Sequence, residues 1–288
     1  MPNKSDIIAT KTATADVHIF DRTKHPAKPD KKGTCSPDLV LAGHTKEGYG
    51  LAWNIRAEGT QAVLSPAAGH IISGSDDGLV CIWDLLALPE ARDIQPLRTY
   101  SLHKDIVEDV TWHFHHSYMF ASCGDDGKVF VFDTREVWPL ARPLYAVEGH
   151  AGREVNAVAF NPFSEHLFAS GSCGADKTVA LWDMRNIKEK MHSFEGHTDQ
   201  VLHVSWAPFS ETVLASCSSD RRLNIWDLHK IGEEQEAEDA EDGPPELLFI
   251  HGGHTDKIAD FCWNTHEDWV IASVADDNVL QIWQVRCY

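Results

Sequence analysis

Positively charged residues are scarce in this sequence. Its 288 residues include 25 Lys and Arg against 44 Asp and Glu, which gives a formal net charge of −19. Proteins that bind DNA or RNA directly neutralise the phosphates with clustered Lys and Arg. The charge balance therefore argues against a nucleic-acid-binding surface. It indicates cationic partners instead, because a strongly negative surface repels anions.

Long apolar runs are also missing. None approaches the roughly 20 residues that cross a bilayer, and residues 1–12 lack the apolar core of a signal peptide. The seven cysteines include no Cys-x-x-Cys pair and are odd in number, which favours a reduced compartment, the cytosol or the nucleus. With 43% hydrophobic residues, the chain is nevertheless too apolar for disorder and long enough for a large core.

Sequence motifs of catalysis are absent as well. The chain has no HExxH, GxSxG or Gly-rich phosphate-binding motif. His113, His115 and His116 stand close together, but no Cys or carboxylate lies at ligand spacing from them, which is untypical of a zinc site. We therefore expect no metal, no cofactor and no enzymatic activity.

What the sequence does contain is an internal repeat. Five strand-like runs end in an aromatic residue, and a partial unit ends at Phe20. Each of the five aromatics has an Asp six residues upstream and a His near the start of its unit. These residues are His44, Asp77 and Trp83; His103, Asp126 and Phe132; His150, Asp176 and Trp182; His197, Asp220 and Trp226; and His254, Asp277 and Trp283.

Each unit is predicted to form short strands. In the fourth unit, residues 201–206 alternate in polarity, and a polar turn separates the apolar runs 213–217 and 223–226. This pattern resembles the WD40 repeat, a four-stranded β-propeller blade. The resemblance implies an all-β propeller with five full blades and a partial N-terminal blade, whereas the family has seven blades. The expected segments are 1–37 for the partial blade and linker, and 38–84, 97–133, 144–183, 191–227 and 247–285 for the repeats.

The resemblance gives the repeated His, Asp and Trp a structural role. In such blades the Asp orients the His, and a buried imidazole and a buried indole each need a hydrogen-bond partner. The residues assigned to this structural tetrad are His44, Asp77, Trp83, His150, Asp176, Trp182, His197, Asp220, Trp226, His254, Asp277 and Trp283. The first unit departs from the usual spacing by an insertion near Ile55–Leu64, which is either a surface loop or an artefact of gene prediction.

Several stretches narrow the resemblance further. They are residues 7–12, 46–51, 175–183, 220–227, 231–235 and 238–254. Together they are similar to the retinoblastoma-binding, MSI-type histone-binding WD40 family, the small subunit of chromatin assembly factor. That family has a long N-terminal helix, a first blade and part of the next blade upstream of this pattern. The resemblance therefore implies an N-terminally truncated chain, either a fragment or an incomplete gene model.

The segment 233–246, called the acidic loop below, carries eight acidic residues and a Pro-Pro pair. Taken alone, it is typical of a solvated loop. In the family, the corresponding loop packs against the N-terminal helix and holds the first helix of histone H4 through charge-assisted carboxylate–arginine pairs. The resemblance gives this role to Asp239 and Asp242. The further residues that it assigns to this histone-binding loop are Glu238, Glu241, Leu247, Leu248 and Phe249.

A second family surface is the acidic top of the propeller, which takes basic tails such as that of histone H3. The positions that match it are Glu47, Tyr49, Glu108, Asp125, Asn156, Lys257 and Asp276. Two positions depart from the family pattern: Gln200 replaces an acid and Leu202 replaces an aromatic residue. These changes should weaken capture of Arg or Lys, because charge pairing and cation–π contact are both reduced.

The resemblance thus implies a non-enzymatic scaffold or chaperone that binds histones H3 and H4. Its expected location is the nucleus, and a second location in the cytoplasm stays open. The expected partners are subunits of chromatin assembly, deacetylase, remodelling or Polycomb complexes, with no direct contact to nucleic acid or membrane. Two alternatives remain at this point: another WD40 adaptor, such as the substrate receptor of a ubiquitin ligase, and a non-functional fragment.

Overall fold

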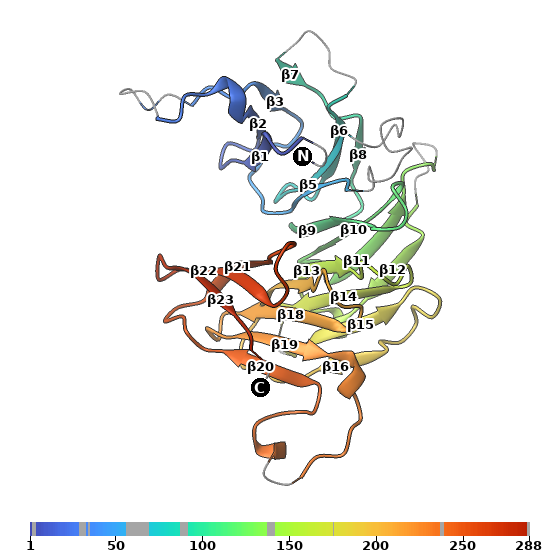
Figure 1. The fold of residues 1–288 in the computed structure, drawn as a ribbon. Helices are drawn as coiled ribbons and strands as arrows, with labels where there is room; N and C mark the ends of the chain where they lie inside the picture. The colour runs from blue at the N-terminus through green and yellow to red at the C-terminus, as the bar shows by residue number, and fades with distance from the viewer. Residues whose placement is uncertain are drawn as a thin grey trace. The chain divides into compact units, whose positions relative to one another are not determined.

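The computed structural model describes residues 1, 4–28, 33, 35–55, 69–86, 92–136, 142–174, 176–236 and 239–286. This part of the chain is all-β, with short strands, a few 3-10 turns and no α-helix (Figure 1). None of its helical segments has the length and apolarity of a membrane span. The chain divides into two compact units: unit 1 is residues 1–124 with 131–143, and unit 2 is residues 125–130 with 144–288.

Unit 1 begins with a small sheet in the order β1-β2-β3-β7. Its strands are β1 (Ile7–Lys11), β2 (Val17–Asp21), β3 (Leu39–Leu41) and β7 (Asp93–Ile94). The first three strands pair antiparallel, whereas β7 joins β3 in parallel. The buried Val17 and Ile19 pack against Ile71 and Trp83 of the next sheet. The partial N-terminal unit is therefore a real sheet that packs like a blade.

The second sheet of unit 1 has the order β4-β5-β6-β8. Its strands are β4 (Leu51–Trp53), β5 (His70–Gly74), β6 (Val80–Asp84) and β8 (Arg98–Tyr100). Strands β9 (Val107–Trp112) and β10 (Met119–Gly124) follow as an antiparallel pair. Strand β11 (Lys128–Asp133) has residues in both units. Apart from Ile55, the predicted insertion Ile55–Leu64 lies outside the described residues.

Unit 2 contains strand β12 (Tyr145–Glu148) and three sheets of its own. The first sheet holds β13 (Val155–Phe160), β14 (Leu167–Ser172), β15 (Val179–Asp183) and β16 (His192–Phe194). The second holds β17 (Val201–Trp206), β18 (Val213–Ser218), β19 (Leu223–Asp227) and β20 (Leu247–His251). The third holds β21 (Ile258–Trp263), β22 (Val270–Ala275) and β23 (Leu280–Gln284).

The first strand of each full sheet in unit 2 carries a register shift that plain alternation does not predict. In β17 the shift falls between Val201 and His203, and equivalent shifts occur in β13 and β21. A β-bulge of this kind adds one residue to a strand and turns the side chains that precede it. As a result, Val201, Val204 and Trp206 are all buried although they do not share one period-two face. The expected simple alternation of residues 201–206 is therefore wrong at its first step.

The sequence repeat and the sheet are offset by one strand. The segment 188–227, for example, begins with β16, which pairs with β15 of the preceding sheet. Similarly, β20 lies after the end of that segment but pairs with β19 inside it. Neighbouring sheets then bury an apolar layer between them, in which Ala215 and Ile225 meet Phe261 and Ile271. This succession of antiparallel sheets confirms the predicted all-β WD40 β-propeller fold.

Candidate functional site

Each sheet of unit 2 contains a chain of hydrogen bonds around a buried His. In the second sheet, His197 Nδ1 lies 2.9 Å from Asp220 Oδ2, and its Nε2 lies 2.8 Å from Ser216 Oγ. The indole Nε1 of Trp226 donates to the same Ser216 Oγ at 2.8 Å. One serine hydroxyl thus serves both rings, and every ring nitrogen in the group has a partner.

The same arrangement recurs in the first and third sheets of unit 2, with longer hydrogen-bond distances in the third. His150 lies 2.9 Å from Asp176 and 2.9 Å from Ser170, to which Trp182 donates at 2.8 Å. In the last sheet, His254 bonds Ser273 at 2.8 Å and Trp283 donates to that serine at 3.2 Å, while Nδ1 of His254 is 3.5 Å from Asp277. The group is tight in the middle of unit 2 and looser at the last sheet.

Unit 1 shows one variation. His44 Nδ1 is 3.3 Å from both carboxylate oxygens of Asp77, and its Nε2 is 3.0 Å from Ser73 Oγ. The indole of Trp83, however, donates to the Ala42 carbonyl at 3.1 Å instead of the serine. The place of that donor near Ser73 is taken by Lys11, whose ammonium bonds Ser73 Oγ at 2.8 Å and the Gly74 carbonyl. Burial lowers the pKa of Lys11 to about 8.

Serine is the member of these groups that sequence reasoning missed. The serines that bond the histidines are Ser73, Ser122, Ser170, Ser216 and Ser273. Each is fully buried. A nearly constant spacing does carry the signal, because four of these serines lie four residues before the repeated Asp, whereas Ser170 lies six residues before Asp176.

Electrostatics hold the acidic member of each group in its charged form. Burial by itself would raise the pKa of Asp176, but hydrogen bonds from His150 and Ser172 outweigh it and lower that pKa to about 2. Burial of Asp220 is likewise outweighed by the hydrogen bond from His197, so its pKa is lowered. A permanently ionised carboxylate bonded to a buried imidazole fixes the ring orientation, which is a structural task.

The acidic loop leaves β19 through a short turn and returns at β20. Its described acids Glu233, Glu234, Glu236, Asp239, Glu241 and Asp242 are all exposed. Asp239–Glu241 forms a 3-10 turn, and Asp242 N–H donates to the Asp239 carbonyl at 3.1 Å. Within the described part of the chain, none of these carboxylates has a Lys, Arg or His partner. Glu238 lies outside the described residues.

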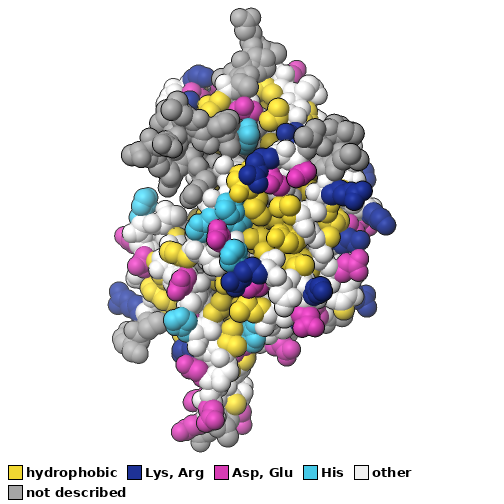
Figure 2. Space-filling model, turned by 90° about the vertical axis from the view of Figure 1, so that its right-hand side faces the viewer, with side chains coloured by type: hydrophobic (Ala, Val, Ile, Leu, Met, Phe, Trp, Pro, Cys, Tyr) yellow, Lys and Arg dark blue, Asp and Glu magenta, His cyan; other side chains and the backbone are white. Residues whose placement is uncertain are grey.

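The eighth acid of the acidic loop behaves differently from the others. Glu246 is 5% exposed, and its Oε1 lies 2.7 Å from Nε2 of His192 on β16. Its carbonyl accepts from Asp227 N–H at 2.9 Å. Reading the whole segment as a solvated or ligand-binding acidic run is therefore wrong at Glu246, which anchors the loop. Figure 2 shows carboxylate side chains gathered at the end of the molecule where this loop lies in Figure 1.

The three apolar residues that follow the loop belong to β20. Leu247 pairs with Trp226 and packs among the residues between the first and second sheets of unit 2. Leu248 packs on the layer between the second and third sheets. Phe249 pairs with Ile225, is 37% exposed and has its ring 5.9 Å from that of Trp283. Of the three, Phe249 offers the most apolar surface to a partner.

Three of the top-face positions lie in unit 1. Glu47 is exposed, and its carbonyl accepts from Ser75 Oγ at 2.7 Å. Tyr49 is 75% exposed and stands between two glycines. A Cβ at the first of these, Gly48, would lie 2.5 Å from the Ser75 backbone, so the tight packing beneath Tyr49 requires glycine. Glu108 is half-buried on β9.

The other four top-face positions lie in unit 2. Asp125 is half-buried, and the side-chain amide of Asn156 donates a hydrogen bond to the Val201 carbonyl at 2.9 Å. Lys257 and Asp276 form an exposed ion pair with a distance of 3.1 Å. Each of the two positions that depart from the family pattern has a contact of its own in the structure. Gln200 accepts from the Cys173 thiol at 2.7 Å, and Leu202 packs on the apolar layer of the last two sheets.

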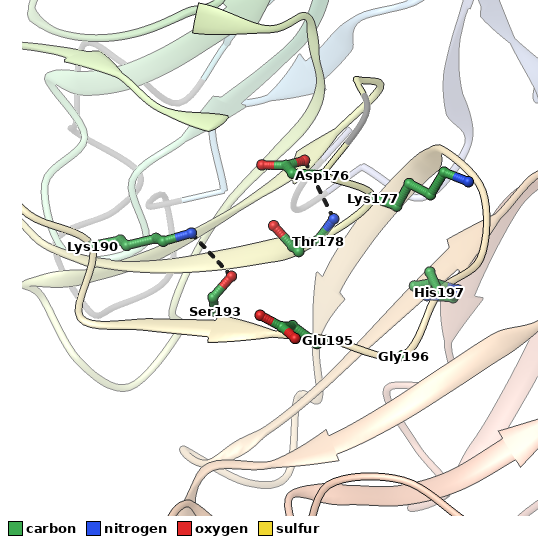
Figure 3. A pocket seen from close by; sticks show the side chains of 8 residues that line it. All are labelled: Asp176, Lys177, Thr178, Lys190, Ser193, Glu195, Gly196 and His197. Atoms are coloured by element: carbon green, nitrogen blue, oxygen red, sulfur yellow. Dashed lines mark hydrogen bonds between the residues drawn. The ribbon is translucent and has the colours of Figure 1, made fainter. Parts of the chain in front are cut away.

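The remaining candidates for chemistry have structural explanations. Nδ1 of His113 accepts from the backbone N–H groups of His115 and His116, so it closes a turn. The described residues contain no cluster of three or more His, Cys, Asp or Glu suited to a metal ion. A polar pocket of about 360 Å³ is lined by charged groups of both signs, among them Asp176, Lys190 and Glu195 (Figure 3). In it, Lys190 donates to Ser193 at 3.1 Å.

A comparison with protein-family models identifies the repeat. The family described as "WD domain, G-beta repeat" matches residues 39–84, 94–133, 141–183, 188–227 and 245–284, well over half of the chain. WD40 propellers are typically non-enzymatic scaffolds that bind other proteins. Together with the repeated strands and the His–Ser–Asp groups described above, the match shows that the chain belongs to the WD40 repeat family.

Proposed function

We propose that this WD40 protein is a nuclear, non-enzymatic histone-binding scaffold that takes the basic surface of H3–H4 through its acidic loop and its top-face residues. The WD40 repeats make it a protein-interaction scaffold. The histone partner, the chromatin complexes and the nuclear location are the parts that we propose beyond this. The MSI-type resemblance of residues 231–254 supports them.

The observation that carries the proposal is the exposure of the acidic loop. Asp239, Glu241 and Asp242 lie together on one short turn with their carboxylates in solvent. Carboxylates that are free and close together suit arginines, since a guanidinium forms bidentate, charge-assisted pairs. The buried Glu246 fixes one end of this turn to β16 through His192. A preorganised acidic turn loses less entropy when a basic helix binds.

Phe249 extends the same surface with apolar contact. It lies on β20, directly after the loop, and is 37% exposed. A basic amphipathic helix would place arginines against Asp239 and Asp242 and an apolar side chain against Phe249. This combination favours a histone helix over an unstructured basic tail at the acidic loop. A basic tail suits the exposed Glu47 and Tyr49 of unit 1 better, because an aromatic ring and a carboxylate together capture Lys or Arg.

The test is binding of a recombinant H3–H4 dimer to the full chain, measured by isothermal titration at physiological salt. The doubly substituted Asp239→Ala, Asp242→Ala chain should bind at least about tenfold more weakly, because removing charged partners from a complex costs on the order of 1.5–3 kcal/mol each. Glu189→Ala with Glu211→Ala is the matched control, since it removes the same charge from exposed positions outside the acidic loop.

The outcomes separate the specific from the general effect. Loss of binding in the Asp239/Asp242 variant with retention in the Glu189/Glu211 variant supports the proposal. An equal, small loss in both would mean that net charge alone attracts the histones. Unchanged affinity in the Asp239/Asp242 variant would remove the acidic loop from the histone site.

A further inference from the structure

The polar pocket of unit 2 contains a buried hydroxyl that lacks a hydrogen-bond partner (Figure 3). Thr178 lines the pocket and is 7% exposed. Within the described part of the chain, nothing bonds its Oγ1. Buried hydroxyls in native structures are nearly always hydrogen-bonded, so this one requires an explanation. A ligand in the pocket of about 360 Å³ would supply the partner.

The pairing of β15 with β16 explains which side chains line this pocket. Val179 pairs with Phe194, and both are buried. Thr178 and Glu195 are the next residues along the two strands, so their side chains point to the opposite face of the sheet. Ser193 shares that face with Glu195. Two hydroxyls and a carboxylate from two strands therefore border the same space.

Two opposite charges at this pocket are not paired with each other. The ammonium of Lys190 donates to Ser193 Oγ at 3.1 Å, which holds it beside the pocket. Glu195 is exposed. Among the described residues, neither Lys190 nor Glu195 takes part in an ion pair. A ligand that carries both signs of charge could bridge them.

The other charged side chains of the pocket are already engaged. Asp176 Oδ2 lies 2.9 Å from Nδ1 of His150. Lys177 donates to the Thr198 carbonyl at 2.5 Å, and its amine points away from the other side chains in Figure 3. One cation and one anion are thus left for a ligand.

The next sheet shows that the WD40 repeat itself does not require this set of side chains. The positions that correspond by strand pairing are occupied there by Arg222, Ile250 and Gly252. They provide neither a hydroxyl nor a carboxylate. Arg222 is exposed, whereas its counterpart Thr178 is buried. The hydroxyls and the carboxylate are therefore particular to the first sheet of unit 2 in this comparison.

We infer that this pocket binds a free α-amino acid as a zwitterion. The carboxylate of the ligand pairs with Lys190, and its ammonium pairs with Glu195 and donates to Thr178 Oγ1. A ligand with a single charge would leave one of the two protein charges unpaired, and the net charge of −19 disfavours a free anion. Because the side chains that line the pocket are all polar, a small polar amino acid such as serine fits best.

Ligand-observed NMR titration of the full chain with L-serine tests this inference. Ethanolamine and 3-hydroxypropionate are matched probes, because each keeps the hydroxyl of serine and only one of its two charges. We expect serine to bind with a dissociation constant on the order of 1 mM, and each single-charge probe to bind at least about tenfold more weakly. Absence of serine binding overturns the inference, as does a single-charge probe that binds equally well.

Substitutions connect the binding to this pocket. Lys190→Gln and Glu195→Gln should each weaken serine binding at least about tenfold, because each removes one charged partner. Thr178→Val should weaken binding without lowering the melting temperature, since the lost hydroxyl has no partner in the described chain. Lys188→Gln with Glu189→Gln is the matched control, because both positions are exposed and outside the pocket lining.

The control variant should bind serine as the unsubstituted chain does, and circular dichroism confirms that each variant is folded. Unchanged binding in the three pocket variants would place the amino acid elsewhere and overturn the inference. An equal loss in the control variant would do the same, because it would reduce the effect to general surface charge.

Discussion

The carboxylate of Glu246 lies 2.7 Å from the imidazole Nε2 of His192, although 54 residues separate the two in sequence. The pair joins the end of the acidic loop to β16 of the preceding sheet. The side chain of Glu246 is 6% exposed and that of His192 is 24% exposed. The link therefore lies largely out of water, where an unsatisfied carboxylate is costly.

Removing this link should loosen the base of the acidic loop and destabilise the fold. We expect Glu246→Ala to lower the free energy of unfolding by about 1–3 kcal/mol, the usual cost of leaving a buried polar group without its partner. Glu246→Gln, which can still accept a hydrogen bond from His192, should cost less. Urea denaturation measures both. Glu236→Ala, at an exposed position of the same loop, is the control; equal stability of the two alanine variants would contradict the anchoring role.

Substitution of a shared serine should lower the free energy of unfolding far more than substitution of a neighbouring serine. Ser216→Ala removes the acceptor of the Trp226 indole and the partner of His197. Because two buried ring nitrogens lose a bond, we expect thermal denaturation to show a destabilisation of about 2–4 kcal/mol. Ser219 provides the contrast, since its buried Oγ has no hydrogen-bond partner in the described structure. Ser219→Ala should change the free energy of unfolding by less than about 0.5 kcal/mol, and a reversed order would refute this account.

Asp176 should make the fold sensitive to acid. Its pKa is lowered from 3.8 to about 2 in the folded chain, so folding stabilises the ionised form. The contribution is complete above pH 3.8 and is lost as the pH falls through about 2. The difference in melting temperature between the unsubstituted chain and Asp176→Asn should therefore be largest near neutral pH and shrink toward pH 2. A difference that stays constant over this interval would exclude a lowered pKa.

Gly243 should be required for the return of the acidic loop. Its φ of 134° lies in the region that L side chains rarely adopt, and a Cβ there would lie 2.7 Å from Cδ2 of Leu247. Gly243→Ala is expected to cost about 1 kcal/mol or more. Gly252→Ala is the control, because nothing lies within 4 Å of a Cβ at that position and its φ is not positive. Chemical denaturation distinguishes the two, and equal midpoints would argue against strain at Gly243.

The strands and their order could be predicted from the sequence because spacing repeats. A turn Asp six residues before a terminal aromatic fixes a hairpin between two strands, and that local signal survives in every full repeat. The bulge in β17 could not be predicted in this way. It depends on where Val201 and Val204 pack between two sheets. Tertiary packing, and not the local pattern, selects it.

In the candidate site, too, some features follow from the local sequence and others depend on contacts with distant segments. Exposed carboxylates such as Asp239 and Asp242 follow from composition, since a run of like charge is solvated unless a partner binds it. The burial of Glu246 does not follow, because its partner His192 comes from a distant segment. Ser216 was overlooked for a different reason: a small polar residue inside a strand gives no periodic signal until its His and Trp partners are known.

The offset between repeat and sheet has a consequence for how the chain can be cut or rearranged. Strand β16 completes the sheet of one repeat but is carried by the next, and β20 does the same one step later. A protease that cleaves at a repeat boundary therefore separates the last strand of a sheet from the other strands of that sheet. The N-terminal fragment then ends in a sheet with an unpaired edge, and the C-terminal fragment begins with a strand that has lost its partner. Main-chain hydrogen bonds thus join each repeat to the next one. Insertion, deletion or exchange of a module should preserve the sheets only when the breakpoints fall between β16 and β17 or between β20 and β21.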